Sequence, residues 1–152
     1  MKIQLIFPAR PIETARSSFT VMPLSLTLLA ALTPQDHELT LIDMFAGDQP
    51  DYETDADLVG ITVRTPVAIK AYEIADEFRK RGKKVILGGP HVFAMPEEAR
   101  MHASAAAIGE AEQLWPVIMQ DAEHGEAQGF LCQRALPNRA AERIGASRKG
   151  TT

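Results

Sequence analysis

Segments rich in Val, Ile and Leu alternate along the chain with segments in which apolar residues recur at helical spacing. The Val-, Ile- and Leu-rich segments are of strand length and carry few charges, which is typical of strands covered on both faces. The clearest helical pattern lies at residues 67–81, where Val67, Ile74 and Phe78 share one face. The pattern predicts strands at residues 3–7, 39–45, 58–63, 85–87 and 105–108, and helices at 23–32, at 67–81, from 96 onward and around 114–122.

Strands that alternate with helices through short connections predict a parallel α/β sheet, which right-handed crossovers cover with helices on both faces. We expect one domain at residues 1–125. Residues 45–57 are rich in Gly, Pro and Asp, which predicts a loop. Residues 126–152 lose the pattern and carry five basic against two acidic residues. We expect a basic tail there, either disordered or a loosely docked helix.

The composition excludes several classes of protein. The 152 residues, 45% of them hydrophobic, suit a single folded domain, and the net charge of −4 leaves no wide basic surface for nucleic acid. No apolar run reaches the roughly 18–20 residues that cross a bilayer, so neither nucleic acid nor a membrane is an expected partner. The single cysteine, Cys132, excludes an internal disulfide and an iron–sulfur cluster held by this chain alone. These features predict a cytoplasmic protein.

Candidate binding residues follow the predicted strands. Ligands of open parallel sheets bind beyond the carboxyl ends of the strands, where the strand order reverses. That rule selects the loops at residues 8–11, 64–66, 88–91 and 109–110. Gly88 and Gly89 form either a tight turn or a place where a ligand approaches the backbone. Thr65 and Glu110 either cap a helix or contact a ligand, and Arg64 is either solvated or a contact to a phosphate or amide.

Catalytic and metal-binding motifs are not found. His91 is either polar surface or a metal ligand, and no two histidines have zinc spacing such as HExxH. The phosphate-loop patterns GxxxxGK[ST] and GxGxxG and the nucleophile elbow GxSxG are absent. Phospho-receivers need acidic residues at the ends of the first and third strands, where this chain has Pro8 and Arg64. We therefore expect no catalytic residue and no metal ligand in this chain alone.

Several ordered motifs are similar to those of one known family. They read DLVGITVRTP at residues 57–66, AYEIA at 71–75, FRKRG at 78–82, VILGGPH at 85–91, PEEA at 96–99 and GEAE at 109–112. Together they resemble the amino-terminal cobalamin-binding domain of the cobalamin-dependent radical S-adenosylmethionine enzymes. The resemblance covers most of residues 1–125.

The resemblance implies a flavodoxin-like (Rossmann-like) five-stranded parallel sheet of order 2-1-3-4-5, with helices on both faces. It also implies that a corrinoid, and with it cobalt, lies across the carboxyl edge, with the nucleotide tail against the glycine turn. We also expect Gly89→Val to weaken corrinoid binding without unfolding the sheet, because the new side chain would point at the ligand. The implied cofactor-binding residues are Ser25, Arg64, Thr65, Gly88, Gly89, Pro90, His91, Gly109 and Glu110.

Two features depart from the full-length enzymes of this family. The DxHxxG motif, with which other cobalamin domains ligate cobalt, is absent, since the first loop reads Pro8-Ala9-Arg10-Pro11. No protein histidine is therefore expected below the cobalt. The CxxxCxxC cluster motif of the radical domain is absent too. We interpret the chain as a stand-alone or truncated cobalamin-binding domain, at most the cofactor-binding part of a radical enzyme.

Three other interpretations stay open from the sequence. The chain could be an interaction module whose basic tail docks on a separate radical S-adenosylmethionine catalytic protein. It could be a flavodoxin-like protein that binds a flavin. It could also be a remnant that binds nothing.

Overall fold

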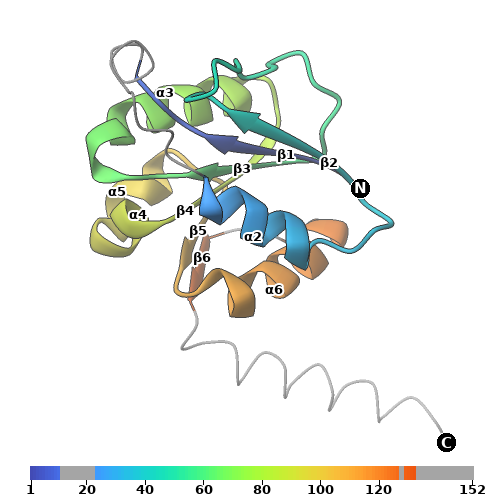
Figure 1. Ribbon diagram of the computed structural model, residues 1–152. Helices are drawn as coiled ribbons and strands as arrows, with labels where there is room; N and C mark the ends of the chain where they lie inside the picture. Colours follow the sequence, from blue (N-terminus) through green and yellow to red (C-terminus); the bar gives the residue numbers. More distant parts are fainter. Residues whose placement is uncertain (11–22, 127–128, 133–152) are drawn as a thin grey trace, which may run out of the picture.

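A computed structural model describes residues 1–10, 23–126 and 129–132 of the chain (Figure 1). In these residues six strands form one sheet in the order β2-β1-β3-β4-β5-β6, and every neighbouring pair is parallel. The first five strands follow the expected order 2-1-3-4-5, so the flavodoxin-like fold class is confirmed. The strands are β1 (Lys2–Phe7), β2 (Glu38–Asp43), β3 (Leu58–Thr62), β4 (Lys84–Gly88), β5 (Ala105–Ile108) and β6 (Gly129–Cys132).

Helices cover both faces of the sheet and enclose two hydrophobic clusters. One face carries the 3-10 turn η1 (Thr65–Val67), α3 (Ala68–Lys80), α4 (Pro90–Ala94) and α5 (Pro96–Met101). The other face carries α2 (Leu24–Leu32) and α6 (Ala111–Glu123), which lie side by side in Figure 1. The carboxyl ends of all these strands meet at one edge of the sheet, because the strands are parallel.

The central strand β3 shows why its sequence lacks polar alternation. All five of its residues are buried. Val59 and Ile61 pack into the cluster under α3, whereas Leu58 packs into the cluster under α2 and α6. A strand that is covered on both faces needs an apolar residue at nearly every position, which is the pattern that the sequence displays.

The sixth strand differs from the sequence-based expectation of a tail that begins at residue 126. Residues Gly129–Cys132 pair with Ala105–Ile108 of β5, so the sheet extends beyond residue 125. Four residues without a hydrophobic period give no signal that could be separated from a loop. The rest of the expected tail, residues 133–152, lies outside the described residues.

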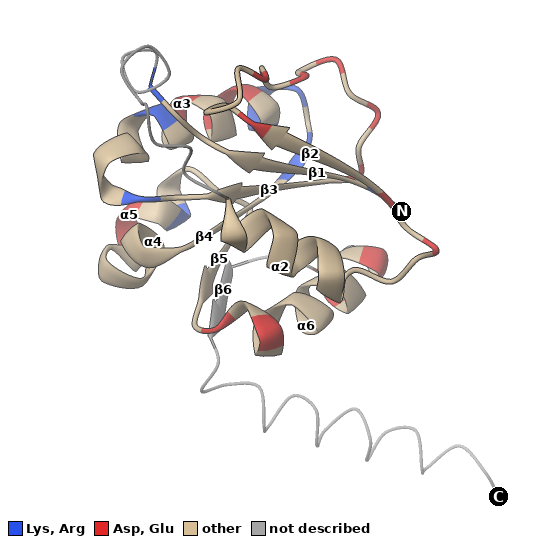
Figure 2. Cartoon of the chain, in the orientation of Figure 1, with Lys and Arg blue, Asp and Glu red and all other residues tan. Residues whose placement is uncertain are grey.

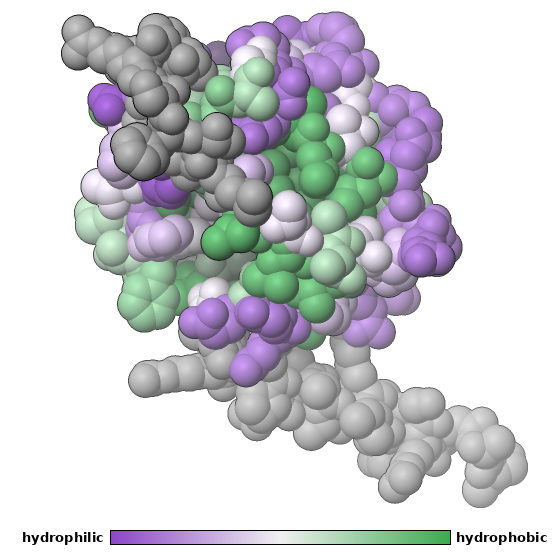
Figure 3. All heavy atoms as spheres, in the orientation of Figure 1, coloured by the Kyte–Doolittle hydropathy of each residue, from purple (hydrophilic) through white to green (hydrophobic). Residues whose placement is uncertain are grey.

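Helix α2 carries no charged residue and is tan along its whole length in Figure 2. Leu24 at its start is 69% exposed, and Leu41 on the edge strand β2 is 40% exposed. Hydrophobic surface accordingly gathers in the middle of the face seen in Figure 3. Within the described part of the chain, no helix has the length and apolar character that would span a membrane.

Candidate functional site

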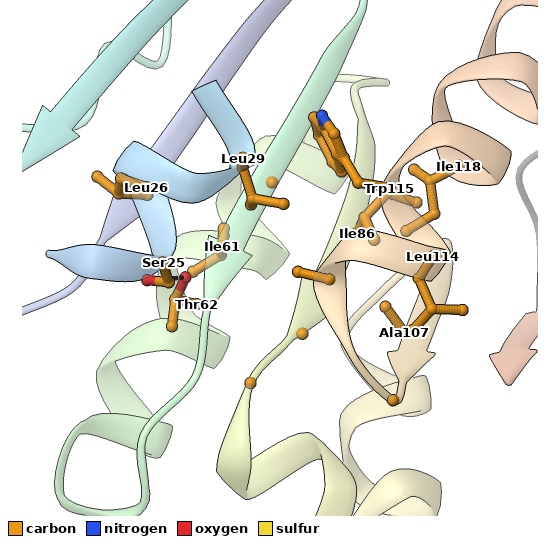
Figure 4. A pocket seen from close by; sticks show the side chains of 15 residues that line it. Ser25, Leu26, Leu29, Ile61, Thr62, Ile86, Ala107, Leu114, Trp115 and Ile118 are labelled. Atoms are coloured by element: carbon orange, nitrogen blue, oxygen red, sulfur yellow. Dashed lines mark hydrogen bonds between the residues drawn. The ribbon is translucent and has the colours of Figure 1, made fainter. Parts of the chain in front are cut away.

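A cavity of about 140 Å³ lies between α2, α6 and the sheet (Figure 4). Its helical walls come from Leu26 and Leu29 of α2 and from Leu114, Trp115 and Ile118 of α6. Its floor comes from β3, β4 and β5, and it reaches the carboxyl edge at the residues that follow β4 and β5. The floor and edge residues are Gly60, Ile61, Thr62, Ile86, Gly88, Gly89, Ala107 and Gly109.

Small residues on the strands create this space. At Gly88 a Cβ would have only Ala107 within 4 Å, at 3.6 Å from its Cβ, so a larger side chain there would project into the cavity. At Gly60 a Cβ would lie 2.7 Å from Leu5 Cδ2 and 4.0 Å from the Trp115 ring. Gly60 thus allows Leu5 to pack closely against the strand, while Gly88 leaves the floor open.

Two hydroxyl groups introduce polarity at the end of the apolar cavity. Ser25 Oγ lies 3.2 Å from Thr62 Oγ1, and this pair joins the first turn of α2 to the end of β3 (Figure 4). Ala111, the first residue of α6, also lines the cavity, so the amino terminus of that 13-residue helix lies at the same place. An apolar cavity with a few convergent polar groups is typical of a small-molecule site.

Backbone hydrogen bonds hold the β3 and β4 loops together at the carboxyl edge. Val63 N donates to Gly88 O at 2.7 Å, and His91 N donates to Val63 O at 3.1 Å. Gly89 has a φ of +107°, and a Cβ there would lie 2.9 Å from Val63 O. The close approach of the two backbones therefore requires glycine at position 89.

This geometry corrects the expectation for Gly89→Val. The added side chain would point into the backbone of Val63 rather than toward a ligand. The substitution would strain the turn itself, so it cannot separate ligand contact from folding. Gly88 is the residue whose substitution fills the cavity.

A row of polar side chains lies beside the turn. His91 Nδ1 is 3.1 Å from Thr65 Oγ1, and His91 Nε2 is 3.2 Å from Glu98 Oε1 of α5. The hydrogen bond with His91, and next the neighbouring Tyr72 hydroxyl, lower the pKa of Glu98. Burial and the Glu98 carboxylate raise the pKa of Tyr72. Thr65 is exposed, so its hydroxyl is the end of this row that a ligand can reach.

Arg64 is turned toward the β1 side of the carboxyl edge. Its Nη2 donates to Pro8 O at 3.0 Å, and its guanidinium lies 4.7 Å from the Phe7 ring centre and 5.0 Å from that of Phe45. Cation–π contact with both rings fixes the side chain. Arg64 thus ties the loop after β1 to the end of β3.

The structure brings some of the expected binding residues together and separates others. Ser25, Gly88, Gly89 and Gly109 line the cavity, whereas Arg64, Thr65, Pro90, His91 and Glu110 do not. Pro90 begins α4. Glu110 occupies the amino-terminal cap position of α6, but its side chain makes no capping hydrogen bond. The contact of these nine residues with a ligand stays a prediction.

Sequence reasoning missed most of the cavity wall. Gly60 and Thr62 come from β3 and Trp115 from α6, and these elements meet only in the folded chain. A glycine inside an otherwise apolar strand was the one available signal, because such a glycine often marks close approach. Among the described residues, no group of three His, Cys, Asp or Glu side chains could hold a metal ion.

The fold and the cavity define a flavodoxin-like α/β domain with a ligand site at the carboxyl edge of its sheet. Comparison with known families identifies it further. The B12 binding domain family matches residues 12–118, and the chain belongs to this family. The expected cobalamin-binding domain is thereby confirmed.

Known relatives are similar to this chain over a limited part of their own length. A bacteriochlorophyllide d C-8(2)-methyltransferase of Chlorobaculum tepidum is 50% identical over 98 residues, which are 64% of this chain and 22% of the relative. The C-12(1)-methyltransferase of the same organism is 35% identical over 69% of this chain and 23% of its own. An uncharacterised methyltransferase of Pyrococcus horikoshii is 31% identical over 86% of this chain and 32% of its own. The chain thus spans less than a third of these relatives.

Proposed function

We propose that this domain binds a cobalamin whose nucleotide tail enters the cavity between α2 and α6 while the corrin ring lies over the carboxyl edge. The observation that carries the proposal is the apolar cavity that opens at the glycine turn after β4. At about 140 Å³ the cavity is too small for a whole corrinoid, but it suits a flat aromatic group. The ring would then stay outside, against Gly89 and the neighbouring loops.

The residues present fit the chemistry of the tail. The apolar walls of α2 and α6 match an aromatic base, and the Ser25 and Thr62 hydroxyls are available to a sugar. The amino terminus of α6 offers backbone N–H groups to the tail phosphate, which favours an anion there despite the acidic net charge. Exposed Thr65 and the glycine backbone lie where the amide groups of the ring would come.

We further infer that the domain serves a radical S-adenosylmethionine methyltransferase, as part of the same polypeptide or as a separate protein. The methyltransferase names of the relatives and the length that they have beyond the matched part support this. Bound cobalamin supplies a cobalt atom that can carry a methyl group. The residues of this chain would hold and orient the cofactor, and the chemistry on the substrate would belong to the catalytic unit.

Retention of corrinoid by the purified protein tests the proposal. The protein is mixed with hydroxocobalamin at micromolar concentration, desalted, and examined for corrinoid absorbance. Gly88→Leu should weaken binding by about tenfold or more, because its side chain fills the cavity. Ala31→Leu adds the same side chain at an exposed position of α2 and should bind as the wild type does.

Two results would contradict cobalamin binding. One is that the wild type retains no corrinoid after desalting. The other is that the wild type retains flavin mononucleotide, offered in a parallel sample, in preference to hydroxocobalamin. Urea unfolding of both variants shows whether a loss of binding reflects a filled cavity or a loss of folding.

A further inference from the structure

Three side chains form a continuous row from the exposed carboxyl edge to α5. Thr65 Oγ1 lies 3.1 Å from His91 Nδ1, and the other ring nitrogen, Nε2, lies 3.2 Å from Glu98 Oε1. The imidazole in the middle is only 12% exposed, whereas Thr65 is exposed. The row therefore connects a carboxylate on α5 to an exposed hydroxyl at the carboxyl edge, where the corrin ring is proposed to lie.

Other groups enclose the imidazole without entering the row. The Tyr72 ring of α3 lies 6.1 Å from the His91 ring. The His102 ring stacks on the Tyr72 ring, with the two ring centres 4.3 Å apart. His102 Nδ1 lies 2.8 Å from Asp76 Oδ2. The titratable groups that face His91 are thus Glu98 from α5 and Tyr72 from α3, with His102 and Asp76 one layer further out.

Hydrogen-bonding capacity fixes the direction of each bond in the row. An ionised carboxylate only accepts, so His91 Nε2 must carry the hydrogen that it donates to Glu98. In a neutral imidazole Nδ1 is then an acceptor, and the Thr65 hydroxyl must donate to it. With its hydrogen donated to His91, the exposed Thr65 hydroxyl can only accept from a ligand.

We propose that Glu98, acting through His91, is a positioning residue that makes the Thr65 hydroxyl an acceptor for the peripheral amide N–H groups of the corrinoid. This inference rests on the proposed function.

The location of Thr65 supports its contact with a ligand in the edge region. Thr65 begins η1 three residues after Thr62, which lines the cavity. His91 lies two residues after Gly89, which lines it as well. The hydrogen bonds between Val63 and both Gly88 and His91 hold these two loops in register, so the row cannot move away from the mouth of the cavity without breaking them.

A double-mutant cycle tests the inference through binding of hydroxocobalamin. Thr65→Val removes the hydroxyl at nearly constant shape and should weaken binding about threefold to tenfold. Glu98→Gln removes the bias between the two imidazole tautomers and should weaken it about threefold. In the Thr65→Val background Glu98→Gln should have no further effect, because Glu98 acts only through that hydroxyl. Equal effects of Glu98→Gln in both backgrounds, or none in either, would overturn the inference.

One further measurement separates this inference from the proposed function. Imidazole ¹⁵N chemical shifts of the ligand-free protein should report His91 protonated at Nε2 in the wild type at about pH 8. A hydrogen on Nδ1 would contradict the positioning role even if corrinoid binds. No corrinoid binding by the wild type, with Nε2 protonated, would contradict the ligand contact and the proposed function together.

Discussion

The indole of Trp115 donates a hydrogen bond from Nε1 to Thr33 Oγ1 at 2.9 Å. Thr33 is the cap residue that follows α2, and its hydroxyl in turn donates to Leu29 O at 2.7 Å. The indole belongs to α6 and forms part of the cavity wall. This bond therefore fixes the ring plane of Trp115 and joins the two helices that enclose the proposed nucleotide site.

Loss of that hydroxyl should destabilise the domain. Trp115 is 2% exposed, so Thr33→Val leaves a buried indole N–H without its partner. We expect the free energy of unfolding to fall by about 1–3 kcal/mol, measured by urea denaturation. Thr27→Val is the matched control, because Thr27 is exposed and its hydroxyl bonds only to Leu24 O of the same helix. Equal losses in the two variants would show that the indole bond is not the cause.

The two neighbouring glycines after β4 should respond differently to alanine. A Cβ at Gly88 meets only Ala107 at an ordinary contact distance, so Gly88→Ala should change the free energy of unfolding by less than about 1 kcal/mol. Gly89 has a positive φ, and its Cβ would meet Val63 O at 2.9 Å. Gly89→Ala should therefore cost about 1–3 kcal/mol, visible as a lower midpoint of urea unfolding. Similar midpoints for both variants would contradict the turn geometry.

Acidification should weaken the domain through Glu98. Contact with His91 lowers the pKa of Glu98 from its usual value of 4.5, so the folded state favours the carboxylate. The stabilisation is complete above pH 4.5 and is lost as the pH falls through the lower pKa of the folded state. The free energy of unfolding should then fall more steeply below pH 4.5 in the wild type than in Glu98→Gln. Glu97→Gln, an exposed position in the same turn of α5, should keep the wild-type slope.

The strands could be predicted because their signal is local and strong, whereas their order was implied only by the resemblance to a known family. Residues 58–61 carry no polar side chain because helices cover both faces of this strand, and such a run is typical of a buried parallel strand. The same reasoning failed for Gly129–Cys132, because that strand depends on pairing with β5 rather than on its own pattern. The short helix Pro90–Ala94 was missed for a related reason: glycine and proline before His91 indicated only a turn.

The candidate site could be predicted only where its residues are neighbours in the sequence and lie in one loop. Gly88 and Gly89 were found because two glycines follow a strand at the carboxyl edge. The pairing of Ser25 with Thr62, and of Trp115 with Thr33, joins residues that lie 37 and 82 positions apart. Such contacts depend on how α2 and α6 are placed on the sheet. No periodicity along the chain encodes that placement.

The sixth strand should contribute to stability although the sequence gives it little pattern. Gly129–Cys132 pairs along the whole of β5, so a chain that ends at residue 125 would leave the backbone of Ala105–Ile108 without a neighbour on one side. We expect such a chain to lose about 2–4 kcal/mol of the free energy of unfolding relative to a chain that ends at residue 132. The exposed edge should also promote association, measurable by size-exclusion chromatography at increasing protein concentration.

The same truncation should reach the proposed site through β5. Gly109 follows that strand directly and lines the cavity, so loosening of β5 at its carboxyl end would weaken hydroxocobalamin binding as well as folding. Urea midpoints and retained corrinoid should therefore fall together in the chain that ends at residue 125. If both properties equal those of the chain that ends at residue 132, β6 is dispensable, and the five strands that the sequence predicts are sufficient for the domain.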